Sequence, residues 1–183
     1  MAVQAKTQAT FEEYRSLPET NQIVELIDGE IVVNPPRDKH QKTLWQIVTT
    51  LTPLMAKGEA PFAPTGLHFN DSNSYEPDLF WVSPENTQCV LEENGRYWQG
   101  APDLIVEILS PSTASDDRGI KFEMYQHYGV REYWLVDPEA KFVEVYGRDG
   151  DRFERQGVFK ADQSFVSAVL NDATINIQSW FSQ

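Results

Sequence analysis

Two charged side chains, Glu107 and Lys121, stand where the surrounding residues predict a buried environment. Residues 104–109 (LIVEIL) form a near-continuous apolar run, typical of a central β-strand that is covered on both faces. The two-residue period of a strand places Glu107 on the same face as Ile105 and Leu109. Because an isolated buried carboxylate is costly, the sequence predicts a cation close to Glu107.

The segment that follows this strand can supply the cation. The loop PSTASDD offers an N-cap at Asp116 or Asp117, and the expected helix runs to about Tyr128 and stops at Gly129. At about 100° per residue, Lys121 falls inside the apolar face of this helix. A half-buried lysine needs an acidic partner, and Glu107 is the candidate because the helix is expected to cover its strand.

A third candidate, Asp78, follows Pro77 and precedes the strand-like run 79–82 (LFWV). Turns use both Pro and Asp, so this pair alone is weak evidence. The strands bearing Asp78 and Glu107 are expected to be consecutive and therefore adjacent, which could bring the two carboxylates together. Two carboxylates in a small space need a compensating cation, and Mg²⁺ or Mn²⁺ suits Asp, Glu and backbone carbonyl ligands. Lys121 could then hold a water or stabilise charge on a phosphate.

Two further polar residues, Glu25 and His40, are second-rank candidates. The run IVELIDGEIVV predicts a hairpin at Asp28-Gly29 that pairs Glu25 with Val32. The expected core face carries Val24, Leu26, Ile31 and Val33. Glu25 lies on the other, mixed face, where it is either an ordinary exposed carboxylate or part of a polar cleft. A helix is expected from His40 to about Lys57, and His40 is the first residue of its apolar stripe. His40 is there either a capping or packed residue or a functional one.

The order of the expected elements predicts an α/β fold. The middle of the chain is helix, strand, strand, strand, helix, strand, with the central strands mostly buried. Thr10 and Glu13 predict a capping box for a short N-terminal helix, and Asp149-Gly150 a C-terminal hairpin. Residues 84–100 are expected to be loop. With 183 residues and 40% hydrophobic content, we expect one domain over residues 1–183, with its core at about 40–138.

Composition limits the classes of partner. The chain has 28 acidic and 15 basic residues, for a net charge of −13, which argues against sequence-blind nucleic-acid binding. The best local basic patch is Arg37, Lys39, His40 and Lys42, with a solvated helix start as the alternative. The single cysteine, Cys89, rules out an intrachain disulfide and a cysteine-based zinc cluster, and we expect an inert thiol. No signal peptide or membrane-length apolar run is present, so we expect a cytoplasmic protein.

These residues resemble a known family. The order of Pro77-Asp78, Glu107 and a lysine is similar to the PD-(D/E)XK nuclease superfamily, whose core is an αβββαβ sandwich. More closely, VELIDGE, EPDLFWV, APDLIVEILSPST, DDRGIKFEMYQHYGV and REYWLVDP resemble the Uma-two-type restriction endonuclease family. The resemblance covers roughly residues 11–181 and is most specific from Asp103 to Pro138.

The resemblance implies roles for individual residues. Asp78 and Glu107 would ligate Mg²⁺ together with the carbonyl of Ile108, and Lys121 would be the catalytic lysine. The superfamily pattern puts the lysine two residues after the acid, where this chain has Leu109. Lys121 therefore resembles the migrated lysine of divergent members. Glu25 and His40 also match positions that the family's blocks tend to carry.

The leading hypothesis is a Mg²⁺-dependent endonuclease that acts on DNA, plausibly as a homodimer. The alternative is a non-catalytic oligomeric binding or structural module that retains the nuclease fold. In that case Glu107 and Lys121 would be only a buried ion pair.

Overall fold

The computed structural model describes residues 8–18, 20, 22–34, 37–55, 57–93 and 95–182. Its helices are α1 (Phe11–Arg15), α2 (Asp38–Leu51), α3 (Ala114–Arg118), α4 (Ile120–Tyr128) and the 3-10 helix η1 (Gln178–Phe181). Its strands are β1 (Ile23–Ile27), β2 (Glu30–Asn34), β3 (Gly66–Asn70), β4 (Asn73–Tyr75), β5 (Leu79–Trp81), β6 (Val90–Leu91), β7 (Tyr97–Gln99), β8 (Leu104–Ile108), β9 (Glu132–Asp137), β10 (Phe142–Asp149), β11 (Arg152–Lys160), β12 (Ser164–Ser167) and β13 (Ala173–Asn176).

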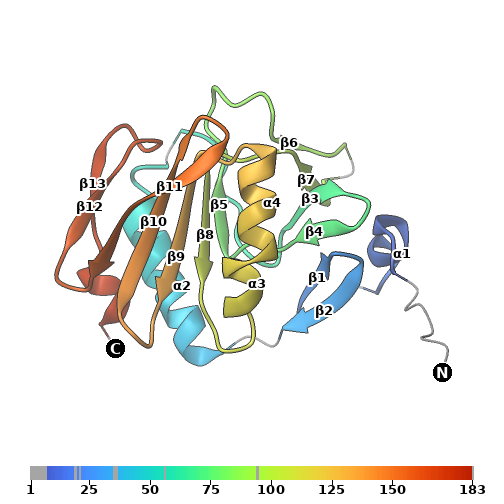
Figure 1. Ribbon diagram of the computed structural model, residues 1–183, viewed down its shortest axis with the longest axis horizontal. Helices are drawn as coiled ribbons and strands as arrows, with labels where there is room; N and C mark the ends of the chain where they lie inside the picture. Colours follow the sequence, from blue (N-terminus) through green and yellow to red (C-terminus); the bar gives the residue numbers. More distant parts are fainter. Residues whose placement is uncertain are drawn as a thin grey trace.

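A five-stranded sheet with the order β11-β10-β9-β8-β5 occupies the centre of the molecule. Strands β8 and β9 are parallel and the other neighbours are antiparallel. Helix α4 lies in front of this sheet and α2 behind it (Figure 1). The arrangement confirms the predicted α/β class, and it leaves the central strands covered on both faces, as the apolar run of β8 predicts.

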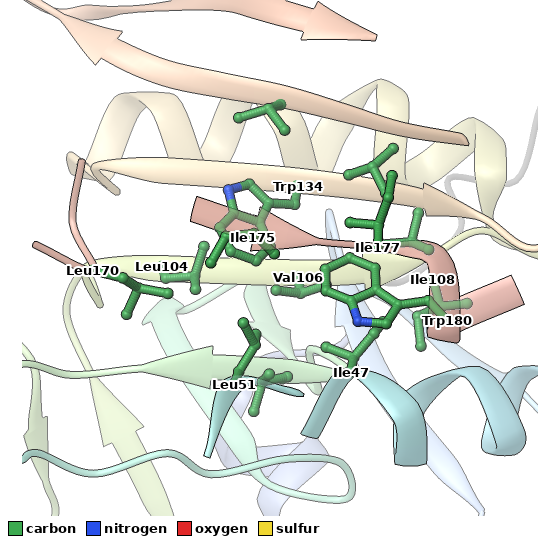
Figure 2. Packing of buried hydrophobic residues seen from close by; sticks show 14 of the residues in the cluster. Ile47, Leu51, Leu104, Val106, Ile108, Trp134, Leu170, Ile175, Ile177 and Trp180 are labelled. Atoms are coloured by element: carbon green, nitrogen blue, oxygen red, sulfur yellow. The ribbon is translucent and has the colours of Figure 1, made fainter. Parts of the chain in front are cut away.

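The alternation of side chains along β8 divides the core into two parts. Leu104, Val106 and Ile108 point toward α2, where they pack with Ile47 and Leu51 (Figure 2). Glu107 therefore shares the opposite face, toward α4, with Ile105. Glu107 is thus held on the face predicted for it.

A second, six-stranded sheet has the order β2-β1-β4-β3-β7-β6 and lies beside α4 (Figure 1). The predicted hairpin is confirmed, with Glu25 opposite Val32 and Asp28-Gly29 in the turn at positive φ. The predicted capping box of Thr10 and Glu13 at the start of α1 is also present.

The expected core face of this hairpin is wrong in part. Leu26 is fully buried, but Ile31 and Val33 are exposed on β2, the edge strand. Glu25, on the mixed face, is buried. The alternation of apolar residues therefore did not identify the buried face of the hairpin. Strand β1 is covered on both faces, whereas neither face of β2 is covered along the whole strand.

The strand-like run expected after Asp78 is confirmed as β5, whereas the preceding β4 belongs to the six-stranded sheet. One other expectation about local structure is wrong. Residues 84–100 are not all loop, because they contain β6 and β7, which pair with each other. Strands of two or three residues are too short to show a periodicity.

The helix predicted after Asp116 or Asp117 is two helices. It starts earlier, with Thr113 at the N-cap of α3, and it is interrupted at Gly119, whose φ and ψ are −110° and −103°. Neither aspartate is an N-cap, since both lie inside α3. The predicted end at Gly129 is confirmed, with this residue in the left-handed conformation.

The C-terminal segment packs against the α2 side of the central sheet, as its apolar residues predict. Trp180 stacks near Trp134, with ring centroids 6.3 Å apart (Figure 2). The buried carboxylate of Glu132 accepts hydrogen bonds from Trp134 Nε1, Ser167 Oγ and the backbone N–H groups of residues 168 and 169. Glu132 therefore fastens the tail to β9.

Cys89 is buried, and burial raises the pKa of its thiol to about 12, in line with the inert thiol that we predicted. Among the residues that the structure describes, none of the helices has the length and apolar character needed to cross a membrane.

Candidate active site

Asp78 and Glu107 meet at one edge of the five-stranded sheet. Because β5 and β8 are antiparallel, the start of β5 lies beside the end of β8. The backbone N–H of Asp78 donates to Glu107 Oε2 at 3.4 Å, and the N–H of Ile108 donates to Asp78 Oδ2 at 2.7 Å. The convergence expected from two adjacent strands is therefore present, although β6 and β7 intervene in the sequence.

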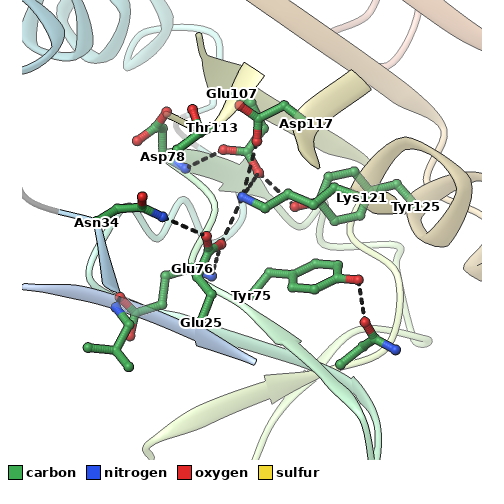
Figure 3. Close-up of polar contacts among 12 residues, drawn as sticks. Glu25, Asn34, Tyr75, Glu76, Asp78, Glu107, Thr113, Asp117, Lys121 and Tyr125 are labelled. Atoms are coloured by element: carbon green, nitrogen blue, oxygen red, sulfur yellow. Dashed lines mark hydrogen bonds and ion pairs between the residues drawn. The ribbon is translucent and has the colours of Figure 1, made fainter. Parts of the chain in front are cut away.

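Lys121 lies at the centre of the site. Its Nζ atom is 2.8 Å from Glu25 Oε1, 3.2 Å from Glu107 Oε1 and 3.2 Å from Asp117 Oδ1. Its side chain is 3% exposed and points between Glu25 on one side and Glu107 on the other (Figure 3). The pairing with Glu107, which the helical face predicted, is confirmed. Burial favours the neutral amine, but the carboxylates of Glu107, Glu25 and Asp117 outweigh burial and raise the pKa of Lys121 well above its usual value.

Glu25 enters the site from β1. Its side chain is 1% exposed, and its Oε1 also accepts the backbone N–H of Glu76 at 3.0 Å. Of the two interpretations left open, the polar cleft is the one observed. The hairpin therefore positions a carboxylate opposite the one supplied by β8 (Figure 3).

Asp117 and Tyr125 complete the surroundings of the ammonium, and sequence reasoning missed both as site residues. Each is four positions from Lys121, so the three share one helical face despite the break at Gly119. The Tyr125 hydroxyl donates to Glu107 Oε1 at 2.7 Å. Burial, together with the charge on Glu107, raises the pKa of Tyr125 well above its usual value and keeps it a donor. The four-residue spacing was the signal that could have identified them.

His40, in the first turn of α2, reaches the same sheet edge. Its Nε2 atom is 3.0 Å from Asp78 Oδ2. Burial works to lower the pKa of His40, but the hydrogen bond and charge of Asp78, with smaller contributions from Asp117 and the Ile108 backbone, raise it above its usual value. Its Nδ1 atom is buried and has no hydrogen-bond partner among the described residues. The carboxylate of Asp78 thus favours the protonated form of His40.

The site holds more acids than cations. We use the term acidic cluster for Glu25, Asp78, Glu107 and Asp117, whose ion pairs among the described residues are with Lys121 and His40. Burial, opposed by Lys121 and reinforced by the neighbouring acids, raises the pKa of Glu107 well above its usual value and that of Asp117 to about 6. With all four acids ionised and both cations charged, the formal excess is two negative charges, the size that a divalent cation would offset.

The acidic cluster lines a small pocket, together with Ile108 and Glu76. The cavity volume is about 30 Å³, enough for roughly two waters. Among the described residues, no three His, Cys, Asp or Glu side chains are grouped closely enough to enclose an ion by themselves. Mg²⁺ commonly takes one or two carboxylates and keeps several waters, so the donor chemistry suits Mg²⁺ or Mn²⁺ better than an ion that needs a closed cage.

Most side chains of the predicted basic patch already form ion pairs with acidic residues. Lys39 Nζ lies 2.7 Å from Glu139, and Lys42 Nζ lies 2.8 Å from Asp38. His40 is paired with Asp78, as described above. The remaining member, Arg37, is exposed and lines the mouth of the pocket.

Comparison with known proteins identifies a family for this chain. The family model described as "Putative restriction endonuclease" (Uma2) matches residues 11–178. A crystal structure of "a putative nuclease belonging to DUF820" from Anabaena variabilis ATCC 29413 is 26% identical, with a TM-score of 0.77 over 94% of this chain and 97% of that chain.

Two relatives are uncharacterized proteins of Synechocystis sp. One is 30% identical over 133 residues, which are 70% of this chain and 73% of the relative. The other is 41% identical over 51 residues, so the match spans only 27% of that relative's length.

Proposed function

This chain belongs to the Uma2 restriction endonuclease family, and we propose on that premise that it is a metal-dependent endonuclease that hydrolyses phosphodiester bonds of DNA. One observation carries the proposal: a buried lysine with raised pKa sits among carboxylates at the sheet edge where Asp78 and Glu107 converge. The relative of known structure is described as "a putative nuclease", which supports the same class of reaction.

In the proposed site, Asp78, Glu107 and the carbonyl of Ile108 would hold one Mg²⁺ or Mn²⁺ ion. The ion would polarise the phosphate and make a nearby water more acidic. His40 holds Asp78 through Oδ2, and Tyr125 holds Glu107 through Oε1, so each carboxylate keeps a fixed direction.

Lys121 is the proposed catalytic lysine. Its ammonium stays charged because of the acids around it, and it would orient the attacking water and offset charge that develops on the phosphate. Glu25 and Asp117 act as positioning residues, since each holds Nζ by one oxygen.

Metal-dependent stability tests the metal site. Adding MgCl₂ or MnCl₂ should raise the melting temperature of the wild type, by an amount equivalent to about 2.7 kcal/mol at a hundredfold excess over Kd. Asp78→Asn should lose this rise. Asp38→Asn is the matched control, because Asp38 is an exposed carboxylate on the same helix end as His40, paired only with Lys42.

Cleavage tests the reaction itself. The wild type should nick or linearise plasmid DNA with Mg²⁺ or Mn²⁺, and Asp78→Asn should not. A wild type that binds the ion but leaves DNA intact would favour the alternative, a non-catalytic module that retains the fold. If neither binding nor cleavage is seen, both the metal site and the endonuclease proposal are wrong.

We extend the proposal to the setting in which the enzyme works. Cutting both strands of a duplex is most simply done by two sites, which favours a homodimer. DNA as substrate favours the cytoplasm as the location. Sedimentation with and without a DNA duplex would test the assembly, and a monomer in both conditions would contradict it.

A further inference from the structure

A negatively charged protein that acts on DNA needs a specific point of contact for phosphate. The chain carries a net charge of −13, and its pocket is lined by the acidic cluster, so the field at the site opposes an incoming polyanion. Productive binding therefore requires a cation at the pocket that is not already neutralised.

Arg37 is that cation. The cationic side chains that line the pocket are Arg37, His40 and Lys121. Lys121 is surrounded by three carboxylates and His40 is bonded to Asp78. Within the part of the chain that the structure describes, Arg37 has no ion-pair partner, and it is exposed. An arginine in this state is suited to two parallel hydrogen bonds with phosphate oxygens.

The surroundings of Arg37 supply further donors. Arg37 is the N-cap residue of α2, a helix of 14 residues, and no side chain caps this end. The positive end of the helix dipole is therefore at the pocket, beside Arg37 and His40. The loop between β8 and α3 lies at the same end of the molecule (Figure 1) and lines the pocket with the hydroxyls of Ser110, Ser112 and Thr113.

These hydroxyls form a connected group with one exposed member. Ser110 Oγ is 2.9 Å from Ser112 Oγ and 3.1 Å from Thr113 Oγ1. Ser112 is exposed, at the outer end of this group of hydroxyls, whereas Thr113 lies deeper, close to Asp117 (Figure 3). Ser112 is thus the hydroxyl positioned to meet a group that arrives from solvent.

We propose that Arg37 and Ser112 form a phosphate-binding rim, which holds one backbone phosphate of the substrate at the mouth of the pocket. This inference rests on the proposed function, since it names the contact that brings the DNA backbone to the acidic cluster. Arg37 carries the charge and the bidentate contact, and Ser112 adds a neutral hydrogen bond. Both are positioning residues that act on substrate binding.

Salt-dependent DNA binding tests the rim. The probe is a short fluorescein-labelled DNA duplex, measured by anisotropy in EDTA so that no metal-dependent cleavage occurs, between about 50 and 200 mM KCl. Arg37→Ala should weaken binding roughly tenfold and lower the slope of log K against log salt by about 0.9, the value for one lost phosphate contact. Arg37→Lys should keep the slope but bind DNA more weakly than wild type, because the compact lysine ammonium replaces the forked guanidinium that makes two parallel hydrogen bonds. Ser112→Ala should weaken binding without changing the slope.

Arg152→Ala is the matched control, because Arg152 is an exposed arginine on β11 and does not line the pocket. The inference is overturned if Arg37→Ala binds like the wild type, if Arg152→Ala has the same effect, or if the wild type does not bind the duplex. The endonuclease proposal fails separately. If the wild type binds DNA through Arg37 but cleaves no DNA with Mg²⁺ or Mn²⁺, the phosphate-binding rim is supported and the proposed reaction is wrong. If the wild type cleaves DNA and Arg37→Ala has an unchanged KM, the rim is wrong and the proposed reaction is supported.

Discussion

Replacement of Lys121 by methionine tests whether the ammonium balances the acids around it. Methionine keeps the unbranched shape and most of the volume but removes the charge. Glu25, Glu107 and Asp117, all within 3.2 Å of Nζ, would then face one another without a cation. Removing one partner of a buried ion pair typically costs about 3–5 kcal/mol. For a chain of this size, that corresponds to a melting temperature lower by about 6–20 °C.

The loss of stability should also depend on pH. Without the ammonium, the pKa values of Glu107 and Asp117, which are already raised, rise further, so ionising these two carboxyls costs more in the folded state than in the unfolded state. Stability is then retained at low pH and falls as pH rises through the raised pKa values. The free energy of unfolding of Lys121→Met, measured by urea titration, should therefore approach that of the wild type at about pH 5 and fall well below it at about pH 8.

Lys39→Met is the control for this experiment. Lys39 pairs with Glu139 at 2.7 Å, but the two side chains are 30% and 71% exposed. Such a pair contributes about 0–1 kcal/mol because water and salt screen it. If Lys121→Met costs no more than Lys39→Met, or costs the same at both pH values, the reasoning from charge balance is refuted.

Three further predictions concern single residues. The pKa of Asp117 is raised from 3.8 to about 6, so this group lowers the stability of the wild type as pH rises through that window. In urea titrations, the free energy of unfolding of Asp117→Asn should therefore gain up to about 3 kcal/mol relative to wild type between about pH 4 and 7. A difference that does not change with pH would contradict the shift. Glu132→Gln places an amide against the N–H donors that hold the C-terminal tail and should lower the free energy of unfolding by about 2–3 kcal/mol. The control Glu154→Gln, at an exposed position, should change it by less than about 0.5 kcal/mol. Equal effects would show that other contacts hold the tail. Cys89 should react with a thiol reagent only in denaturant, and rapid labelling of the native protein would show that the thiol is accessible.

The part of the site that is local in sequence was predictable. Glu107 and Lys121 are 14 residues apart, and strand and helix periodicities placed each on the correct face. Asp78 required only that two buried strands pair. These predictions succeeded because burial leaves a strong pattern in β8 and in the helix that covers it.

The remaining contacts were not predictable because they depend on long-range packing. Glu25 reaches Lys121 from a different sheet, and an alternating strand pattern cannot say which of two faces is covered when both carry apolar residues. Asp117 was one of two predicted N-caps, together with Asp116. Thr113 is an equally good cap residue, and cap chemistry does not choose among the three. The structure selects Thr113, which moves Asp117 one turn into the helix and onto the face of Lys121.

The balance of charge distinguishes a functional site from a structural ion pair in this fold. Two buried acids elsewhere among the described residues have their oxygens satisfied: Glu132 accepts four hydrogen bonds, and Asp103 pairs with Arg131 while also accepting bonds from Ser83 and Asn86. The acidic cluster instead places three carboxylates on one ammonium, and burial raises the pKa values of two of them. A structural pair would need only one acid, since each additional one lowers stability. The excess negative charge is therefore best explained by a cation that joins the site when it works, which favours the metal-dependent enzyme over the non-catalytic module.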